Sequence, residues 1–190
     1  MNIKSIFAIS FVLLIIIGLS GCKSNKEVPE KPSAYSTNTE VEIIPCQNIE
    51  FSDENFFRTT ESSTSSDLLL AKEKSILLAK QRLARIINSN VESAVNSYMA
   101  ERGINKEYEA GKKLKSIVTE VVDDFINDIA ISCENVTTLP NRQYRAFVTV
   151  ESLKKSILDE YIDKVLRDVK LKAIFDRKRF EEIFLSIPNF

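Results

Sequence analysis

Cys22 is the residue whose type and surroundings point most directly to a defined chemistry. It closes the motif Leu-Ser-Gly-Cys at residues 19–22, directly after an apolar run of 14 residues at 6–19 that follows Lys4. A run of this length suits the core of an export signal. It is shorter than the roughly 20 residues that span a bilayer, which disfavours the alternative of an uncleaved transmembrane anchor. We therefore expect a lipoprotein signal peptide at 1–21, cut before Cys22, whose thiol carries a diacylglycerol, with palmitate as the lipid.

Acidic side chains form the second pattern that could do chemistry. Glu120, Asp124 and Asp128 recur every four residues, with Asp123 beside them, so on a helix they would share one face. Three carboxylates could hold a hard cation, but calcium sites usually add carbonyl oxygens from a turning loop. We expect a solvated helix face instead, and we predict no metal site. The lysines expected to balance this face are Lys112, Lys113 and Lys115.

A second acidic group lies at Asp159, Glu160 and Asp163, interleaved with Lys154, Lys155 and Lys164. Acid–base catalysis by carboxylates needs a cleft and shifted pKa values. The sequence indicates neither, so we interpret this group as helix surface. Ser156 follows Lys155 directly, and neighbours on a helix do not face each other, which argues against a serine–lysine catalytic pair. We predict no catalytic residue and no enzymatic activity.

Arg58 follows Phe56 and Phe57 in a polar stretch. An arginine flanked by aromatic residues could anchor a partner or ligand. It could equally cap a helix end or pair with an internal acid, and we favour this structural role.

Composition excludes several classes of function. The chain has no histidine, which excludes catalysis by an imidazole base and metal sites with histidine ligands. After residue 22 the glycines are Gly103 and Gly111, too few for a glycine-rich phosphate loop. We therefore expect no cofactor. Beyond the first 21 residues, 25 Lys and Arg face 27 Asp and Glu, and this near balance gives no basic footprint for nucleic acid.

The remaining cysteines are Cys46 and Cys133. An exported compartment permits a disulfide between them, and two buried free thiols are the alternative.

Residues 22–40 are polar, contain Pro29 and Pro32, and show no apolar period, which predicts a disordered tether behind the lipid. We expect one domain at 41–187. Its first strand is predicted at 41–46, where Pro45 suggests a sheet edge or a strand end. Residues 47–66 are expected to be turn-rich, with Ser65 or Ser66 as the N-cap of a following helix and Asp67 in its first turn.

Apolar residues at helical spacing predict two long helices, one from about 69 to 98 and one over about 106–128. The sequence Asn-Ser-Asn at 88–90 is a possible interruption of the first helix, and Gly103 a left-handed cap after it. Alternation over 129–136 and 144–150 around a turn at 139–143 predicts a hairpin. Residues 152–187 are expected to form a helical extension, with Asp176 as an N-cap and Phe175 and Phe180 as a hydrophobic staple. The predicted fold class is α+β, with a small antiparallel sheet, made of the edge strand and the hairpin, packed against the two long helices.

The order of these segments resembles the Lpp-twenty-type family of small bacterial outer-membrane lipoproteins, in particular the versions found in Bacteroidota. The stretches that carry the resemblance are EIIPC (42–46), FFR (56–58), TSSD (64–67), the helix with Ala71, Ala79 and Ala84, Cys133, YRAFVTVE (144–151) and FDRKRFEEIF (175–184). The resemblance implies a small antiparallel sheet covered by helices, and it supplies no catalytic motif. Because Cys46 and Cys133 match family positions, it also favours the disulfide, which by chain entropy would stabilise the fold by about 4 kcal/mol.

From the anchor motif and the resemblance we expect an outer-membrane lipoprotein of the cell envelope, exposed to the periplasm or on the cell surface. Its expected role is non-enzymatic and structural, through association with other envelope proteins. The alternative is a small binding module for a lipid, a peptidoglycan fragment or a peptide, because apolar helix stripes can wall a pocket.

Overall fold

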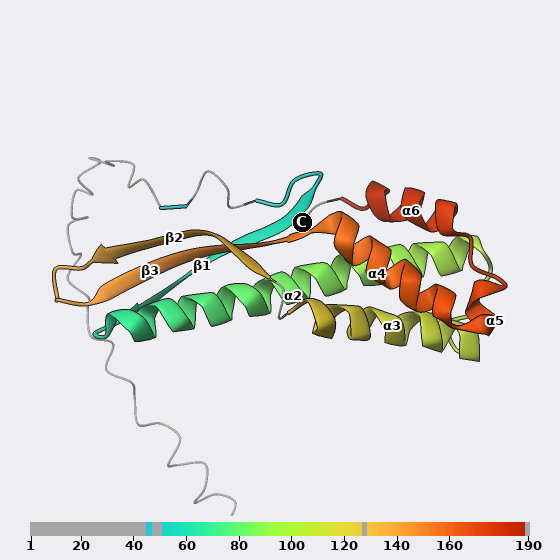
Figure 1. The fold of residues 1–190 in the computed structure, drawn as a ribbon, viewed down its shortest axis with the longest axis horizontal. Helices are drawn as coiled ribbons and strands as arrows, with labels where there is room; N and C mark the ends of the chain where they lie inside the picture. Colours follow the sequence, from blue (N-terminus) through green and yellow to red (C-terminus); the bar gives the residue numbers. More distant parts are fainter. Residues whose placement is uncertain (1–44, 47–50, 127–128, 189–190) are drawn as a thin grey trace, which may run out of the picture. The chain divides into compact units, whose positions relative to one another are not determined.

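The computed structural model describes residues 45–46, 51–126 and 129–188, all within one compact unit, Ile43–Phe190 (Figure 1). The expected signal peptide at 1–21, the lipid-bearing Cys22 and the tether at 22–40 lie outside the described residues. Among the helices that are described, none combines the length and the apolar character needed to cross a membrane.

The sheet has three antiparallel strands in the order β1-β3-β2, with β1 at Phe56–Ser65, β2 at Ala130–Thr138 and β3 at Tyr144–Leu153. The hairpin β2–β3 was predicted by alternation, and the structure confirms it. Its turn is tight enough to place Arg142 at φ +60°, and a register shift between Ile131 and Cys133 interrupts the alternation in β2. In the central strand β3, alternate residues Ala146, Val148 and Val150 are fully buried, because they face the long helix.

Helix α2 (Leu68–Glu101) runs along the whole domain, covering the sheet with its first half and the other helices with its second (Figure 1). Those helices are α3 (Glu109–Phe125), α4 (Lys154–Arg167), the single turn α5 (Val169–Lys172) and α6 (Arg177–Ser186). The core follows α2 between these layers. Its largest fully buried side chains include Tyr98, Tyr161, Phe180, Leu83, Ile87 and Leu114.

The fold class is confirmed as α+β, but its edge strand is a different segment from the expected one. Pro45 and Cys46 lie in a turn, and the rest of the expected 41–46 strand is outside the described residues. The edge strand is β1, in the stretch that we expected to be turn-rich. Threonine and serine fill this strand because its outer face is polar, and β-branched threonine suits an extended backbone.

The ends of α2 are set by local hydrogen bonds. The N-cap is Asp67, whose carboxylate accepts from the Leu70 N–H at 2.9 Å, so the expectation of Ser65 or Ser66 was wrong by one or two residues. The Asn-Ser-Asn stretch does not interrupt the helix, and the Asn90 side chain donates to the Ile86 carbonyl one turn back. Gly103, at φ +66°, follows the helix as predicted, and the Ile104 N–H closes the cap on the Met99 carbonyl.

The C-terminal helix matches its prediction. Asp176 is the N-cap of α6, and its carboxylate accepts from the Arg179 N–H at 3.1 Å. The ring centroids of Phe175 and Phe180 lie 5.4 Å apart, as a hydrophobic staple requires.

Candidate functional site

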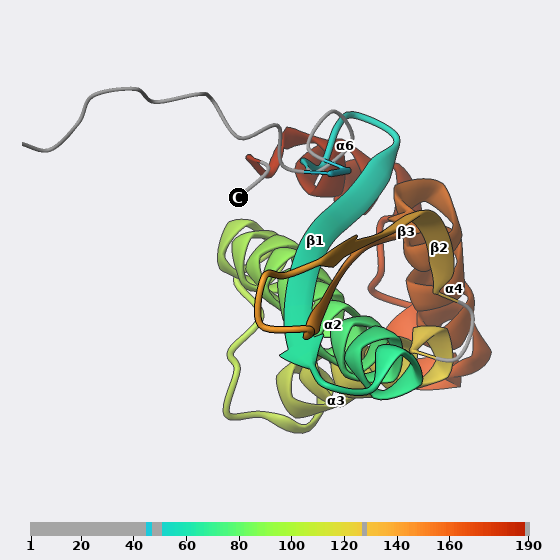
Figure 2. The same ribbon diagram turned by 90° about the vertical axis from the view of Figure 1, so that its left-hand side faces the viewer.

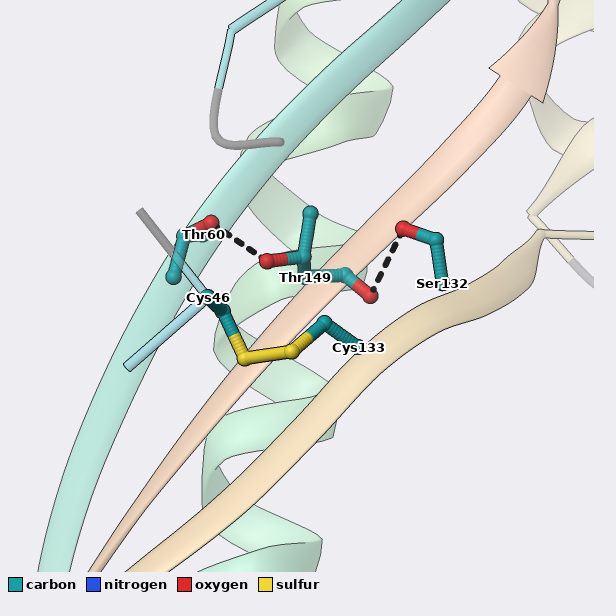
Figure 3. Close-up of a disulfide and its surroundings, with 5 residues drawn as sticks. All are labelled: Cys46, Thr60, Ser132, Cys133 and Thr149. Atoms are coloured by element: carbon teal, nitrogen blue, oxygen red, sulfur yellow. Dashed lines mark hydrogen bonds between the residues drawn. A yellow bond between two sulfur atoms is a disulfide. The ribbon is translucent and has the colours of Figure 1, made fainter. Parts of the chain in front are cut away.

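A disulfide joins Cys46 to Cys133 of β2, with 5.8 Å between the Cα atoms (Figure 3). It lies on the face of the sheet that points away from α2. Beside it the hydroxyls of Thr60 and Thr149 are hydrogen-bonded at 2.6 Å, and Ser132 donates to the Thr149 carbonyl at 3.4 Å. Thr149 is fully buried although it belongs to this outer face. The cross-link therefore fixes the segment that precedes β1 to the far strand of the sheet.

A groove lies at the start of β1, between the loop before that strand, the start of α4 and helix α6. It consists of two hollows of about 400 and 300 Å³ that share Glu54, Lys154, Phe184 and Leu185 as lining residues. Leu153 and Leu158 add apolar surface to the larger hollow. An apolar cleft that contains a few polar groups is the usual form of a small-ligand site, and we call it the Lys154 groove.

Lys154 is the unusual residue of this groove, because it is a lysine with only 8% of its surface exposed. Its ammonium donates to the Asp53 carbonyl and lies 4.9 Å from the centre of the Phe57 ring. Its backbone N–H donates to the Asn55 carbonyl at 2.9 Å. Burial lowers the pKa of the Lys154 ammonium, and the negative charge of Asp53 acts in the opposite direction. These contacts attach the loop before β1 to the first turn of α4.

Ion pairs within and between α4 and α6 lie along the edge of the groove. Lys155 contacts Asp159 at 2.7 Å, and Arg177 contacts Glu181 at 2.7 Å and Asp159 at 3.8 Å. The expected acidic surface at Asp159 is therefore paired both along α4 and across to α6. The Lys155 ammonium is turned toward Asp159.

Arg58 has the structural role that we favoured. Its guanidinium pairs with the carboxylates of Asp53 and Glu151, the latter at 2.7 Å, and it lies 4.7 Å from the Phe56 ring centre. The hydrogen bond from Arg58 is the largest of the effects that lower the pKa of Asp53. Arg58 thus holds the loop before β1 against β3, and both carboxylates that pair with its guanidinium belong to the same chain.

The acidic face of α3 is balanced from a different element than expected. Lys164 of α4 contacts Asp124 at 2.8 Å and Glu120 at 4.0 Å, and it also reaches Glu160 at 3.7 Å. Of the lysines that we expected to balance it, Lys113 pairs instead with Asp168, and Lys115 contacts Glu92 at 3.8 Å. Asp128 lies outside the described residues. Across the described ranges, no group of three or more cysteine or carboxylate side chains could hold a metal ion.

Sequence reasoning placed Lys154 on a solvated helix surface, and that was wrong. No sequence pattern distinguishes the buried Lys154 from its neighbours, since Lys154, Lys155 and Lys164 all lie in the same mixed-charge segment. Its burial follows from the loop before β1, which crosses the start of α4.

Comparisons of the chain with family models, with curated proteins and with solved structures found no match.

Proposed function

We propose that the protein is a lipid-anchored cell-envelope lipoprotein, held to the outer membrane through Cys22, that acts without catalysis by associating with other envelope proteins. The Leu-Ser-Gly-Cys motif after a short apolar run supports the anchor. The Cys46–Cys133 disulfide is the observation that carries the proposal, because such cross-links persist in exported compartments and are rare in the cytosol.

Mass spectrometry of the protein extracted from membranes tests the anchor. We expect a chain that begins at Cys22 and carries a thioether-linked diacylglycerol. The matched control is Cys22→Ser, which should keep residues 1–21 and carry no lipid. An unacylated mature chain, or a retained leader on the unsubstituted protein, would overturn the proposal.

Crosslinking in cells followed by pull-down tests the associative role, and protease treatment of intact cells decides between the periplasm and the cell surface. We expect a small, reproducible set of envelope proteins to be captured through the anchored chain and lost with Cys22→Ser. Turnover of an envelope substrate by the purified protein, abolished by one carboxylate substitution such as Asp159→Asn, would contradict a non-enzymatic role.

The Lys154 groove favours a second candidate function, a binding module for a lipid, a peptidoglycan fragment or a peptide. Leu185 is 69% exposed and lines both hollows, so Leu185→Lys should fill the entrance without disturbing the core. If the groove binds a ligand, native mass spectrometry should detect a co-purified molecule on the unsubstituted chain and not on Leu185→Lys. A mass that fits the bare protein in both samples would exclude this function for the groove.

A further inference from the structure

The first half of α2 has an inverted distribution of apolar side chains. Small residues face the sheet: Ala71, Ser75 and Ala79 have no exposed surface. The Ser75 hydroxyl donates to the Ala146 carbonyl of β3 at 3.0 Å, which shows how closely the helix approaches the strand. Ordinary amphipathic helices place their largest apolar residues on the buried face, so this half needs another explanation for its leucines.

Four leucines of this half are exposed on the side of α2 opposite Ala71, Ser75 and Ala79 or on the flanks of that side. Their exposed fractions lie between 42% and 63%, within ten residues of one helix. We call this surface the leucine face, and its members are Leu69, Leu70, Leu77 and Leu78. Contiguous exposed apolar patches usually mark a surface that contacts a partner or a membrane.

The shape of the leucine face argues for a broad partner. Leu70 and Leu77 are seven residues apart and lie almost on one line along the helix, whereas Leu69 and Leu78 lie on opposite flanks of that line. Glu73 and Lys74 lie between Leu70 and Leu77 on this side of the helix. A helix–helix seam needs two apolar positions in each heptad and would bury these charges. A plane of lipid headgroups can contact a wide, interrupted apolar surface. Lysines of the protein on such a surface can extend into the polar headgroup layer.

Two cations lie on the same side of α2 as the leucine face, Lys74 and Lys80. The sheet covers the opposite side of this half of the helix (Figures 1 and 2), and Arg145, next to the inward-facing Ala146 in β3, lies on the outer face of the sheet, away from the leucines. Within the part of the chain that is described, no ion pair involves Lys74 or Lys80, and Glu73 is the one acidic residue of α2 between Leu69 and Leu78.

We propose that the leucine face docks on the surface of an anionic lipid bilayer, with Lys74 and Lys80 against the headgroups. Partial insertion of leucines supplies the apolar contribution, and each nearby cation adds attraction to anionic lipid. The inference rests on the proposed lipid anchor, because a tethered domain meets the bilayer at a high effective concentration. A weak surface contact is then sufficient to set the orientation of the domain.

The chain contains no tryptophan, so a single tryptophan is a specific reporter. We would compare Leu77→Trp with Val169→Trp, since Val169 is 83% exposed on α5, well away from the leucine face. Each mature acylated chain is reconstituted in vesicles of phosphatidylglycerol and phosphatidylethanolamine, with and without brominated acyl chains. We expect blue-shifted emission and quenching by bromine for Leu77→Trp only. In an unacylated chain expressed from residue 22 with Cys22→Ser, Leu70→Gln/Leu77→Gln should weaken partition into these vesicles at least about tenfold.

Each outcome decides the proposal. Acylated protein in which both tryptophans emit as in water overturns bilayer docking and leaves the anchor intact. A blue shift of Leu77→Trp without lipid, growing with protein concentration, assigns the face to a second copy of the chain and also overturns it. If mass spectrometry finds no lipid on Cys22, the anchor fails, but partition of the unacylated chain still tests the leucine face independently.

Discussion

The two halves of α2 differ in the size of the side chains that they bury. Residues 68–82 lie on a sheet one layer thick, and small side chains such as Ala71 and Ala79 let the backbone approach β3 closely. Residues 83–101 lie among β1, α3 and α6, and large side chains such as Leu83, Ile87 and Tyr98 fill the space between these elements. Burial of a leucine in this helix therefore depends on how many elements surround that turn, and periodicity alone does not determine it.

The strongest test of this contrast is removal of the disulfide, which belongs to the half with the thinner core. Cys46→Ser/Cys133→Ser should lower the free energy of unfolding by about 4 kcal/mol, because the bridge joins residues 87 apart in sequence. Urea unfolding measures the loss.

Amide exchange then locates the effect. In the same variant, amides of β1 and β2 should lose protection before those of α3 and α4. Uniform loss across the domain would show that the two halves are a single cooperative unit.

Matched leucine truncations compare the halves directly. Leu83→Ala should cost about 3 kcal/mol, because Leu83 has no exposed surface and its removal leaves a cavity. Leu77→Ala, six residues earlier and 57% exposed, should change stability by no more than about 0.5 kcal/mol. Urea unfolding of both variants measures the difference, and equal costs would mean that the leucine face is buried in solution.

The sequence could predict the helices, the hairpin and the α+β class, because each has its own periodicity. It could not predict that Leu69 is 63% exposed whereas Leu83, at helical spacing from it, is fully buried, because among the described residues no further layer covers the start of α2. Strand β1 was missed because its serines and threonines lack apolar alternation. Phe57 and Thr59 are nevertheless buried in it, so β-branched content was the available signal.

The candidate site was less predictable than the fold. The Lys154 ammonium donates to Asp53 in the loop before β1, and Arg58 of β1 joins Asp53 to Glu151 of β3. No local sequence pattern brings that loop to α4 and β3. The pairing of Lys164 with Asp124 likewise depends on two helices packing side by side. Charged residues that the sequence suggests are solvated form ion pairs between elements only when the tertiary fold places them together.

A smaller effect is expected at a hydrogen bond in the second half of α2. The Tyr98 hydroxyl accepts from the backbone N–H of Asp176 at 2.7 Å, linking α2 to the start of α6. Tyr98→Phe leaves that N–H without its acceptor and should cost about 1–2 kcal/mol. Thermal unfolding measures it, with Tyr108→Phe as the control, since Tyr108 is 70% exposed. Equal melting temperatures for the two variants would show that Asp176 finds another acceptor.

The smallest effect is expected in acid, in the loop before β1, which Arg58 and Lys154 attach to β3 and α4. The hydrogen bond from Arg58 lowers the pKa of Asp53 below its ordinary value of 3.8. The carboxylate therefore adds stability at pH values above its unfolded pKa, and this contribution disappears as the pH falls through the lower folded pKa. Asp53→Asn should be slightly less stable than the unsubstituted protein at pH 6, and the difference should vanish near pH 2. Because the Asp53 side chain is 44% exposed, solvent screening keeps the difference small. A difference that persists unchanged at pH 2 would show that it does not come from the ionised carboxylate of Asp53.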